Sequence, residues 1–473
     1  MIDTARAALE RGAWQEALDA LEDEPAVPEV LEMRAHALYA LGRLEASIAS
    51  WEEAYAQHAA ADERERAARA AAMIGMYLMM DTGLMAPVRG WLRRADGWLD
   101  GGPETGVHAL IAMVRTYERF MCGDMDGARV QSARAIELGD RYDVDPAVVI
   151  GRVAAARVRI FDGDVAEGLD LLDEVGALLM SGGADPLTTG MMYCELICAA
   201  QGLALHDRAA EWTEVMERWR HGAAIGGING RCRVHRAEML RVSGPCDLAE
   251  AEAIAACAEL RPWMRREYGW PLVELGTIRL RRGDLAGAEA AFVEAHENAW
   301  SPQPGLALLR LEQGEVEAAT ALISDAIEHP VDIPWKERPP FGDLRLAPLL
   351  EARVEIAAAA GDVGAAREAA DRLEAIAASY PSRSLAAGAA LARARAALAA
   401  DDHDTACEAA AVAAGTWADI GAPFESARAR IVLGEAMRAA GNVEGARMEW
   451  HAAEAALGVF GAARWAERAG ELV

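Results

Sequence analysis

Residues 283–295, GDLAGAEAAFVEA, decide the fold. Gly283 is followed by a small residue five positions on (Ala288), a bulky one nine on (Phe292) and a second alanine twelve on (Ala295). Glycine is the residue that most easily adopts the left-handed conformation in which many helices end. A small fifth residue lets the next helix cross closely, and the ninth residue fills the space between the two helices. The stretch therefore predicts the turn and the second helix of a helix pair.

The same spacing recurs along the whole chain, with Leu205 and Asp401 replacing the glycine in two copies. The twelve copies start at residues 12, 42, 83, 123, 163, 205, 244, 283, 314, 361, 401 and 441, and most starts lie 39 to 42 residues apart. One helix pair cannot bury its apolar face alone, so successive pairs stack. The sequence predicts an all-α protein, a right-handed superhelical solenoid of about twelve tetratricopeptide-like helix pairs.

One proline-rich segment interrupts this rhythm. Residues 329–343, HPVDIPWKERPPFGD, coincide with the longest interval between repeats, and prolines break helices. We therefore expect an N-terminal solenoid over residues 1–328, a loop over 329–343, and a C-terminal solenoid over 344–473.

Composition and charge exclude several classes of function. The formal net charge is −28, from 75 acidic and 47 basic residues, and the basic residues are scattered. This disfavours direct binding of nucleic acid, which needs clustered cations. No uncharged stretch is long enough to span a membrane, and the seven cysteines are too scattered for a secreted disulfide framework. The pattern indicates a cytoplasmic protein.

Catalytic motifs are missing from the sequence. It contains no GxSxG, no HExxH and no dinucleotide fingerprint that follows a strand. Cys194, Cys198, Cys232 and His235 could be taken for a zinc site, but the repeat frame places the first two at helix-packing positions. We predict no enzyme activity, no catalytic residues, no cofactor and no metal.

Four segments carry a resemblance to a known family. They are YCELICAAQGLALHDRAAEWTEVMERW (193–219), GRCRVHRAEMLR (230–241), LGTIRLRRGDLAGAEAAFVEAHE (275–297) and PQPGLALLRLEQG (302–314). These segments resemble the helical-repeat sensor region of LuxR-family transcriptional regulators of the MalT type. The resemblance implies a region that senses a small inducer or a protein. Such regulators end in a helix-turn-helix with an LTxRE start, which does not follow Ala463 here, so we expect a sensor region without its output domain.

The repeat frame also predicts which residues face the concave groove of the solenoid. The candidates are Arg157, Glu195, Arg231, Glu238 and Arg241. Arginine in a groove can hold a carboxylate with two parallel hydrogen bonds. The alternative is that these charges form ion pairs on a solvated helix face, where such pairs contribute little.

The function predicted from these observations is non-enzymatic binding. A solenoid suits this role because small rotations in each repeat add up to large changes in the groove. We expect the groove to bind a small molecule or a peptide and to signal to a partner protein. The alternative is a protein-protein scaffold without a small ligand, and self-association into a homo-oligomer is left open.

Overall fold

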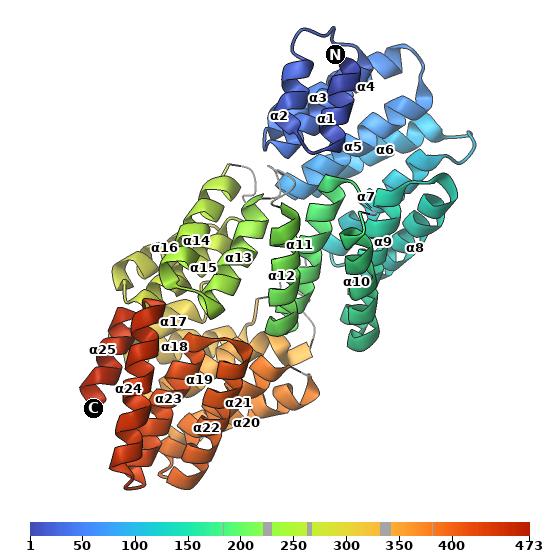
Figure 1. The fold of residues 1–473 in the computed structure, drawn as a ribbon. Coiled ribbons are helices and arrows are strands. Elements are labelled where there is room, and N and C mark those ends of the chain that lie inside the picture. Colours follow the sequence, from blue (N-terminus) through green and yellow to red (C-terminus); the bar gives the residue numbers. More distant parts are fainter. Residues whose placement is uncertain (183, 221–228, 263–266, 332–341, 381) are drawn as a thin grey trace. The chain divides into compact units, whose positions relative to one another are not determined.

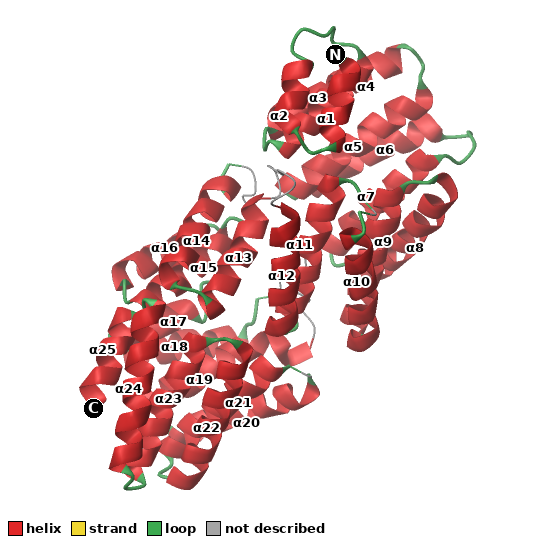
Figure 2. Cartoon of the chain, viewed as in Figure 1, coloured by secondary structure: helices red, strands yellow, loops and turns green. Residues whose placement is uncertain are grey.

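The computed structural model describes residues 1–182, 184–220, 229–262, 267–331, 342–380 and 382–473. Within these ranges every regular element is a helix and no strand occurs (Figure 2), so the all-α class is confirmed. The helices are α1 Ile2–Glu10, α2 Trp14–Ala20, α3 Pro28–Ala40, α4 Leu44–Ala60, α5 Arg64–Thr82, α6 Met85–Leu99, α7 Gly106–Met121, α8 Met125–Tyr142, α9 Asp145–Asp162, α10 Val165–Met180, α11 Pro186–Gly202, α12 His206–Arg220, α13 Asn229–Ser243, α14 Cys246–Leu260, α15 Gly269–Arg282, α16 Leu285–Glu297, α17 Gly305–Glu312, α18 Val316–Glu328, the 3-10 helix η1 Gly342–Leu346, α19 Ala347–Ala359, α20 Val363–Ser379, α21 Arg383–Ala399, α22 His403–Ile420, α23 Pro423–Ala439, α24 Val443–Phe460 and α25 Ala463–Leu472.

The predicted repeat starts mark the turns inside helix pairs. Each lies between an odd-numbered helix, here called an A helix, and the even-numbered B helix that follows it, which gives twelve pairs and a final α25 among the described residues. Backbone φ is positive at nine of these glycines and at Asp401. The nine are Gly12, Gly42, Gly83, Gly123, Gly163, Gly283, Gly314, Gly361 and Gly441. The predicted pairs are therefore confirmed, and so is the physical reason for the glycine.

Two of the twelve turns differ from the predicted pattern. In the sixth pair the left-handed residue is Ala204, with φ of 54°, rather than Leu205. In the seventh pair Gly244 is not left-handed. Pro245 follows it, and α14 begins directly after this proline, at Cys246. A residue before proline is pushed toward extended backbone, so this turn uses different geometry.

Large residues at the ninth repeat position fill the crossing between two paired helices. Phe292 of α16 is fully buried against α15, where a Cβ added to Gly276 would lie 2.5 Å from its ring. Trp450 of α24 is 1% exposed and packs in the same way against Gly434 of α23. The missing Cβ on the A helix therefore allows the close crossing.

By its contacts the chain forms two compact units. Unit 1 consists of the described residues in Met1–Ala199 and Glu211–Cys232. Unit 2 consists of those in Ala200–Ala210, Arg233–Asp332 and Pro340–Val473. Most of the predicted loop, residues 332–341, lies outside the described residues, and the predicted division at 329–343 stays a prediction.

In unit 2 the A helices form an inner layer that closes on itself. Helix α15 contacts α17, α17 contacts α19, α19 contacts α21, α21 contacts α23, and α25 contacts α15. The Trp465 ring of α25 also lies 5.7 Å from the Phe424 ring of α23. These helices run from yellow-green α15 to red α25 in Figure 1. The closing contacts include an ion pair between Arg281 of α15 and Glu425 of α23. The Arg281 guanidinium also lies 4.2 Å from the centre of the Phe424 ring. The inner face of unit 2 is therefore surrounded by its own helices.

None of the helices within the described ranges is both long enough and apolar enough to cross a lipid bilayer.

Candidate functional site

Two of the predicted groove residues, Arg157 and Glu195, pair with each other inside unit 1. Arg157 of α9 and Glu195 of α11 form an ion pair, and their side chains are only 2% and 8% exposed. The hydroxyl of Tyr117 in α7 donates to the same Glu195 oxygen at 3.1 Å, and the guanidinium lies 4.7 Å from the centre of the Phe120 ring. Burial disfavours the charge of Arg157, but Glu195 and Tyr117 outweigh it and raise the pKa of Arg157. This geometry joins three A helices through a buried contact.

Arg231, predicted for the same groove, is also in unit 1. Its Nη2 donates to the backbone oxygen of Met80 at 3.4 Å, and the residue is partly buried. This is a contact to the main chain of another A helix, α5.

The other two predicted residues, Glu238 and Arg241, are in unit 2 and have partners of their own. Glu238 is 2% exposed and accepts a hydrogen bond from Trp270 Nε1 at 2.9 Å. Arg241 pairs with Glu274 of α15, and these side chains are 20% and 7% exposed. Burial disfavours the charge of Arg241, but Glu274 and Glu238 raise its pKa above the ordinary value. A ligand role for the five predicted residues stays a prediction.

The cysteines considered for a zinc site lie in the helical core. Cys194, Cys198 and Cys232 are 3%, 0% and 6% exposed and form no disulfide. In the described part of the chain, no three His, Cys, Asp or Glu side chains gather closely enough to hold a metal ion. The thiols pack as small apolar groups.

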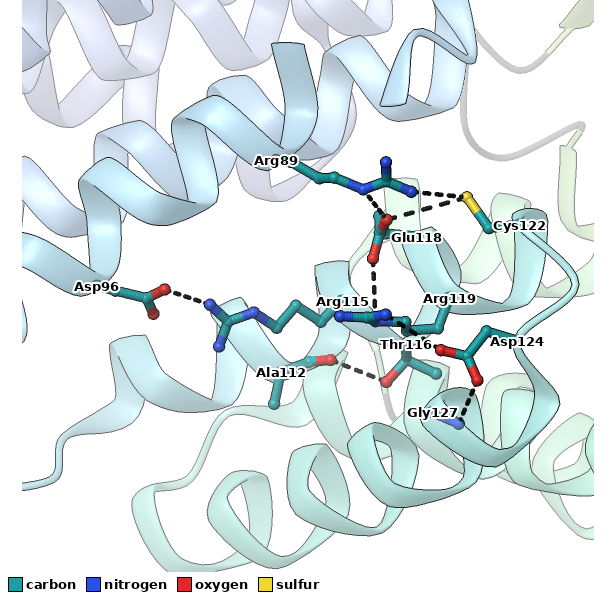
Figure 3. A network of polar contacts seen from close by, with 10 residues as sticks. All are labelled: Arg89, Asp96, Ala112, Arg115, Thr116, Glu118, Arg119, Cys122, Asp124 and Gly127. Carbon is teal, nitrogen blue, oxygen red and sulfur yellow. Dashed lines mark hydrogen bonds and ion pairs between the residues drawn. The ribbon is translucent and has the colours of Figure 1, made fainter. Parts of the chain in front are cut away.

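Unit 1 contains a second polar network, around Glu118 of α7 (Figure 3). The Glu118 side chain is 3% exposed, accepts from Arg89 Nε at 2.5 Å and lies 3.3 Å from Arg119 Nε. Arg89 Nη2 also donates to the Cys122 sulfur at 3.2 Å. Burial raises the pKa of Cys122, which keeps it a neutral thiol. The two arginines neutralise the buried carboxylate, so this network needs no ligand.

A pocket of about 510 Å³ lies between α6, α7 and α8 of unit 1. Two of its charged lining residues, Asp96 and Arg115, form an ion pair with each other (Figure 3). A third, Arg134, pairs with Glu104. Its histidine, His108, accepts a hydrogen bond from a backbone amide at 3.1 Å. The charged groups that line this pocket are therefore paired within the protein.

The inner face of unit 2 presents a row of alternating charges. Arg281 pairs with Glu425, which accepts from Arg428 Nη1 at 2.7 Å. Arg428 Nη2 donates to Glu355 at 2.6 Å, and Glu355 also pairs with Arg395. The five side chains are between 11% and 16% exposed. They come from α15, α19, α21 and α23, so the row joins four A helices.

The pKa values of this row show which charges persist. Burial would raise the pKa of Glu355, but Arg395 and Arg428 outweigh it and lower the pKa to about 2. Burial likewise opposes the Glu425 charge, yet Arg281 and Arg428 lower its pKa to about 2. Burial lowers the pKa of Arg281 to about 10, which still leaves it charged at neutral pH. The row therefore holds three positive and two negative charges.

One carboxyl group stands apart from this row. Burial, followed by the nearby charge of Glu425, raises the pKa of Glu351 from 4.5 to about 7. It lies one helical turn before Glu355 on α19 and packs against Gly388 of α21, where an added Cβ would clash with its carboxyl.

A pocket of about 580 Å³ opens beside the row of charges. Its lining combines three arginines, three glutamates, one tryptophan and apolar side chains from α17, α18, α19, α21, α23 and α25. The charged and aromatic lining residues are Glu312, Glu355, Glu435, Arg395, Arg428, Arg468 and Trp465. Ligand pockets commonly measure roughly 300–1,000 Å³. We refer to it as the unit 2 pocket.

Several charges in the unit 2 pocket are not fully paired. Glu435 makes no hydrogen bond or ion pair with any described residue, and burial raises its pKa while Arg468 and Arg395 oppose that rise. Among the described residues, Arg468 forms an ion pair with Glu312 at 3.8 Å, and its side chain is 54% exposed. Arg395 pairs with Glu355 through Nη1. The pocket can therefore offer one acceptor and several donors to a ligand.

The sequence contained a signal for this pocket that the predicted site did not use. Two of the predicted groove residues, Arg157 and Glu238, lie six residues before their turns at 163 and 244. Glu355, Arg395 and Glu435 lie six residues before the turns at 361, 401 and 441. A predicted groove that included this position in the C-terminal pairs would therefore have contained three residues of the unit 2 pocket.

Comparisons with known proteins add little to this geometry. No family model matches the sequence, and no curated protein matches it. The crystal structure of the APC/C hetero-tetramer Cut9–Hcn1 is similar with 12% identity and a TM-score of 0.37, over 98% of this chain and 95% of that one. Yeast Tom70 is similar with 13% identity and a TM-score of 0.33, over 95% of both chains. Similarity at this level carries no functional argument.

Proposed function

We propose that the chain is a non-enzymatic binding module that holds a segment of a partner protein on the inner face of unit 2. The observation that carries this proposal is the unit 2 pocket, which lies on the closed layer of A helices and has incompletely paired charges. Charged groups in a partly desolvated pocket recognise polar partners through short, charge-assisted hydrogen bonds. The paired charges of unit 1 offer no comparable site.

The charge of the whole chain supports a protein partner rather than DNA. A net charge of −28 repels the phosphate backbone and attracts cationic or neutral surfaces. The resemblance to the sensor region of LuxR-family regulators supports a role in which binding is passed on to a separate output protein. Signalling of that kind needs a partner that contacts this chain directly.

A small molecule is the second candidate for the occupant of the same pocket. It is favoured by the pocket volume of about 580 Å³, which lies within the range of small-ligand sites. In this case the chain would sense the ligand on the inner face of unit 2 and contact its partner elsewhere.

Site-specific photo-crosslinking tests the proposal. A benzophenone amino acid replaces Ala359, an exposed residue that lines the unit 2 pocket, in the full chain expressed in its native cell. The control places the same group at Met448, which is 70% exposed on α24. Specific protein adducts from position 359 but not from position 448 are expected. Adducts from 448 alone, or equally from both, would contradict an inner-face site.

A further inference from the structure

Three charged groups of the unit 2 pocket are available to a ligand. Glu435 of α23 has no hydrogen-bond or ion-pair partner among the described residues. Among the described residues, Arg468 of α25 forms an ion pair with Glu312 at 3.8 Å, and Arg395 of α21 pairs with Glu355 through Nη1. Each side chain comes from a different A helix, and all three line the same pocket.

Glu435 lies within electrostatic reach of both arginines without contacting either. Arg468 and Arg395 each oppose the effect of burial on its pKa, although neither forms an ion pair with it. A guanidinium and a carboxylate that share a pocket without touching leave both groups incompletely compensated. A ligand that carries both signs of charge would compensate them together.

We propose that the unit 2 pocket binds a zwitterion, a free α-amino acid or a short peptide with both termini free. Its ammonium group pairs with Glu435, and its carboxylate pairs with Arg395 and Arg468. This inference rests on the second candidate in the proposed function, a small ligand in the same pocket, because it assigns the chemistry that the inner face recognises. The carboxylate accepts donors that the two arginines do not use within the protein.

Ligands of one charge fit the pocket less well. A phosphate or other anion would meet Glu435, Glu312 and Glu355 on the lining. A simple cation would meet three arginines. It would also find the Trp465 ring already contacted by the guanidinium groups of Arg428 at 5.5 Å and Arg468 at 5.4 Å. The mixed lining therefore selects for a ligand with both charges.

Titration calorimetry with the full chain tests the proposal. The probes are a panel of the free L-amino acids together with dialanine and trialanine, and blocked dialanine with an acetylated amino end or an amidated carboxyl end. We expect at least one unblocked probe to bind at submillimolar concentration, and each blocking group to weaken the binding of its parent about tenfold or more, or about 1.4 kcal/mol. Tighter binding of the peptides would identify a short peptide as the ligand, and tighter binding of the amino acids would identify a free amino acid.

Variants assign each ligand group to its partner. Glu435→Gln should remove the penalty for acetylation, and Arg468→Gln should reduce the penalty for amidation. The matched controls Glu408→Gln and Arg367→Gln change exposed residues of α22 and α20 that do not line the pocket, and should bind like the wild type. Circular dichroism melting checks that each variant is folded.

Three results would overturn the proposal. They are no heat from any unblocked probe at millimolar concentration, equal binding of blocked and unblocked dialanine, or unchanged selectivity in folded Glu435→Gln. Crosslinks from position 359 without zwitterion binding would leave the proposed function standing and remove this inference. Zwitterion binding without protein crosslinks would leave this inference standing and contradict the proposed function.

Discussion

Replacing Glu195 by glutamine should strongly destabilise unit 1. The Arg157 guanidinium is 2% exposed, and within the described ranges Glu195 is the only acidic group that forms an ion pair with it. Two of its nitrogens, Nε and Nη2, have no hydrogen-bond partner in the part of the chain that the structure describes. The variant would leave a buried cation without a counter-charge, and the protein cannot remove that charge by deprotonation because guanidinium stays protonated.

The expected loss follows from what glutamine keeps and what it removes. Its side-chain oxygen can still accept from Arg157 and from Tyr117, which donates to Glu195 at 3.1 Å. The negative charge is lost, and breaking a buried ion pair by removing one partner costs about 3–5 kcal/mol. Because the hydrogen bonds survive, we expect the lower end, about 3 kcal/mol.

Urea unfolding followed by circular dichroism measures this loss. The full chain is used, and amide hydrogen exchange in α9 and α11 assigns the affected transition to unit 1. The control is Asp162→Asn, which breaks the Arg129–Asp162 pair, whose side chains are 49% and 41% exposed. Such a surface pair contributes about 0–1 kcal/mol. A Glu195→Gln loss no larger than that of the control would refute the structural role of the pair.

Three further predictions concern unit 2 and the whole chain. The folded-state pKa of Glu351 is raised from 4.5 to about 7, so its contribution to stability is complete below about pH 4.5 and is lost as pH rises through 7. As pH rises from 5 to 8, the urea midpoint of the wild type should therefore decrease more than that of Glu351→Gln. Equal pH dependence of the two midpoints would contradict the raised pKa of Glu351. Gly276→Ala should cost about 1–3 kcal/mol in chemical denaturation, because the new Cβ would lie 2.5 Å from the buried Phe292 ring. Gly415→Ala in α22, with open space around it, should stabilise the protein by about 0.5–1 kcal/mol. Equal changes in the free energy of unfolding for the two substitutions would contradict the close crossing of α15 and α16. Fluorescence anisotropy at low salt should show no binding to duplex DNA, since weaker screening increases the repulsion of an acidic chain, and salt-sensitive submicromolar binding would reveal a basic patch.

The helix pairs could be predicted because their causes are local. The turn at Gly283 needs a left-handed residue, and the crossing beside it needs a small Ala288 and a large Phe292, all within one short stretch. Because this pattern recurs at a regular interval, each copy strengthens the prediction that the others also form helix pairs. Two turns departed from the pattern: the left-handed residue of the sixth pair is Ala204 instead of Leu205, and the turn at Gly244 differs because Pro245 follows it.

The candidate site could be predicted only in part, because pairing depends on residues far apart in the chain. The frame correctly placed Arg157 and Glu195 on A helices, but their mutual contact joins residues 38 apart across a helix layer. Position alone does not tell whether an arginine faces solvent, a ligand or a carboxylate of the next repeat. The same frame position holds paired Arg157 and unpaired Glu435.

The closure of the inner layer in unit 2 is the feature that the sequence predicts least. The rotation between neighbouring helix pairs is small, and its sum over several pairs decides whether α25 meets α15 or passes it. No single repeat fixes that sum, so Arg281 and Glu425, 144 residues apart, give no local sign that they pair. Closure also changes what the last repeat must do. The end of an open solenoid needs a polar cap, whereas here the end of the stack is covered, with Gly461 against Cys246 and Arg464 against Gly283. Helix α25, which closes the layer against α15, also supplies Trp465 and Arg468 to the wall of the unit 2 pocket.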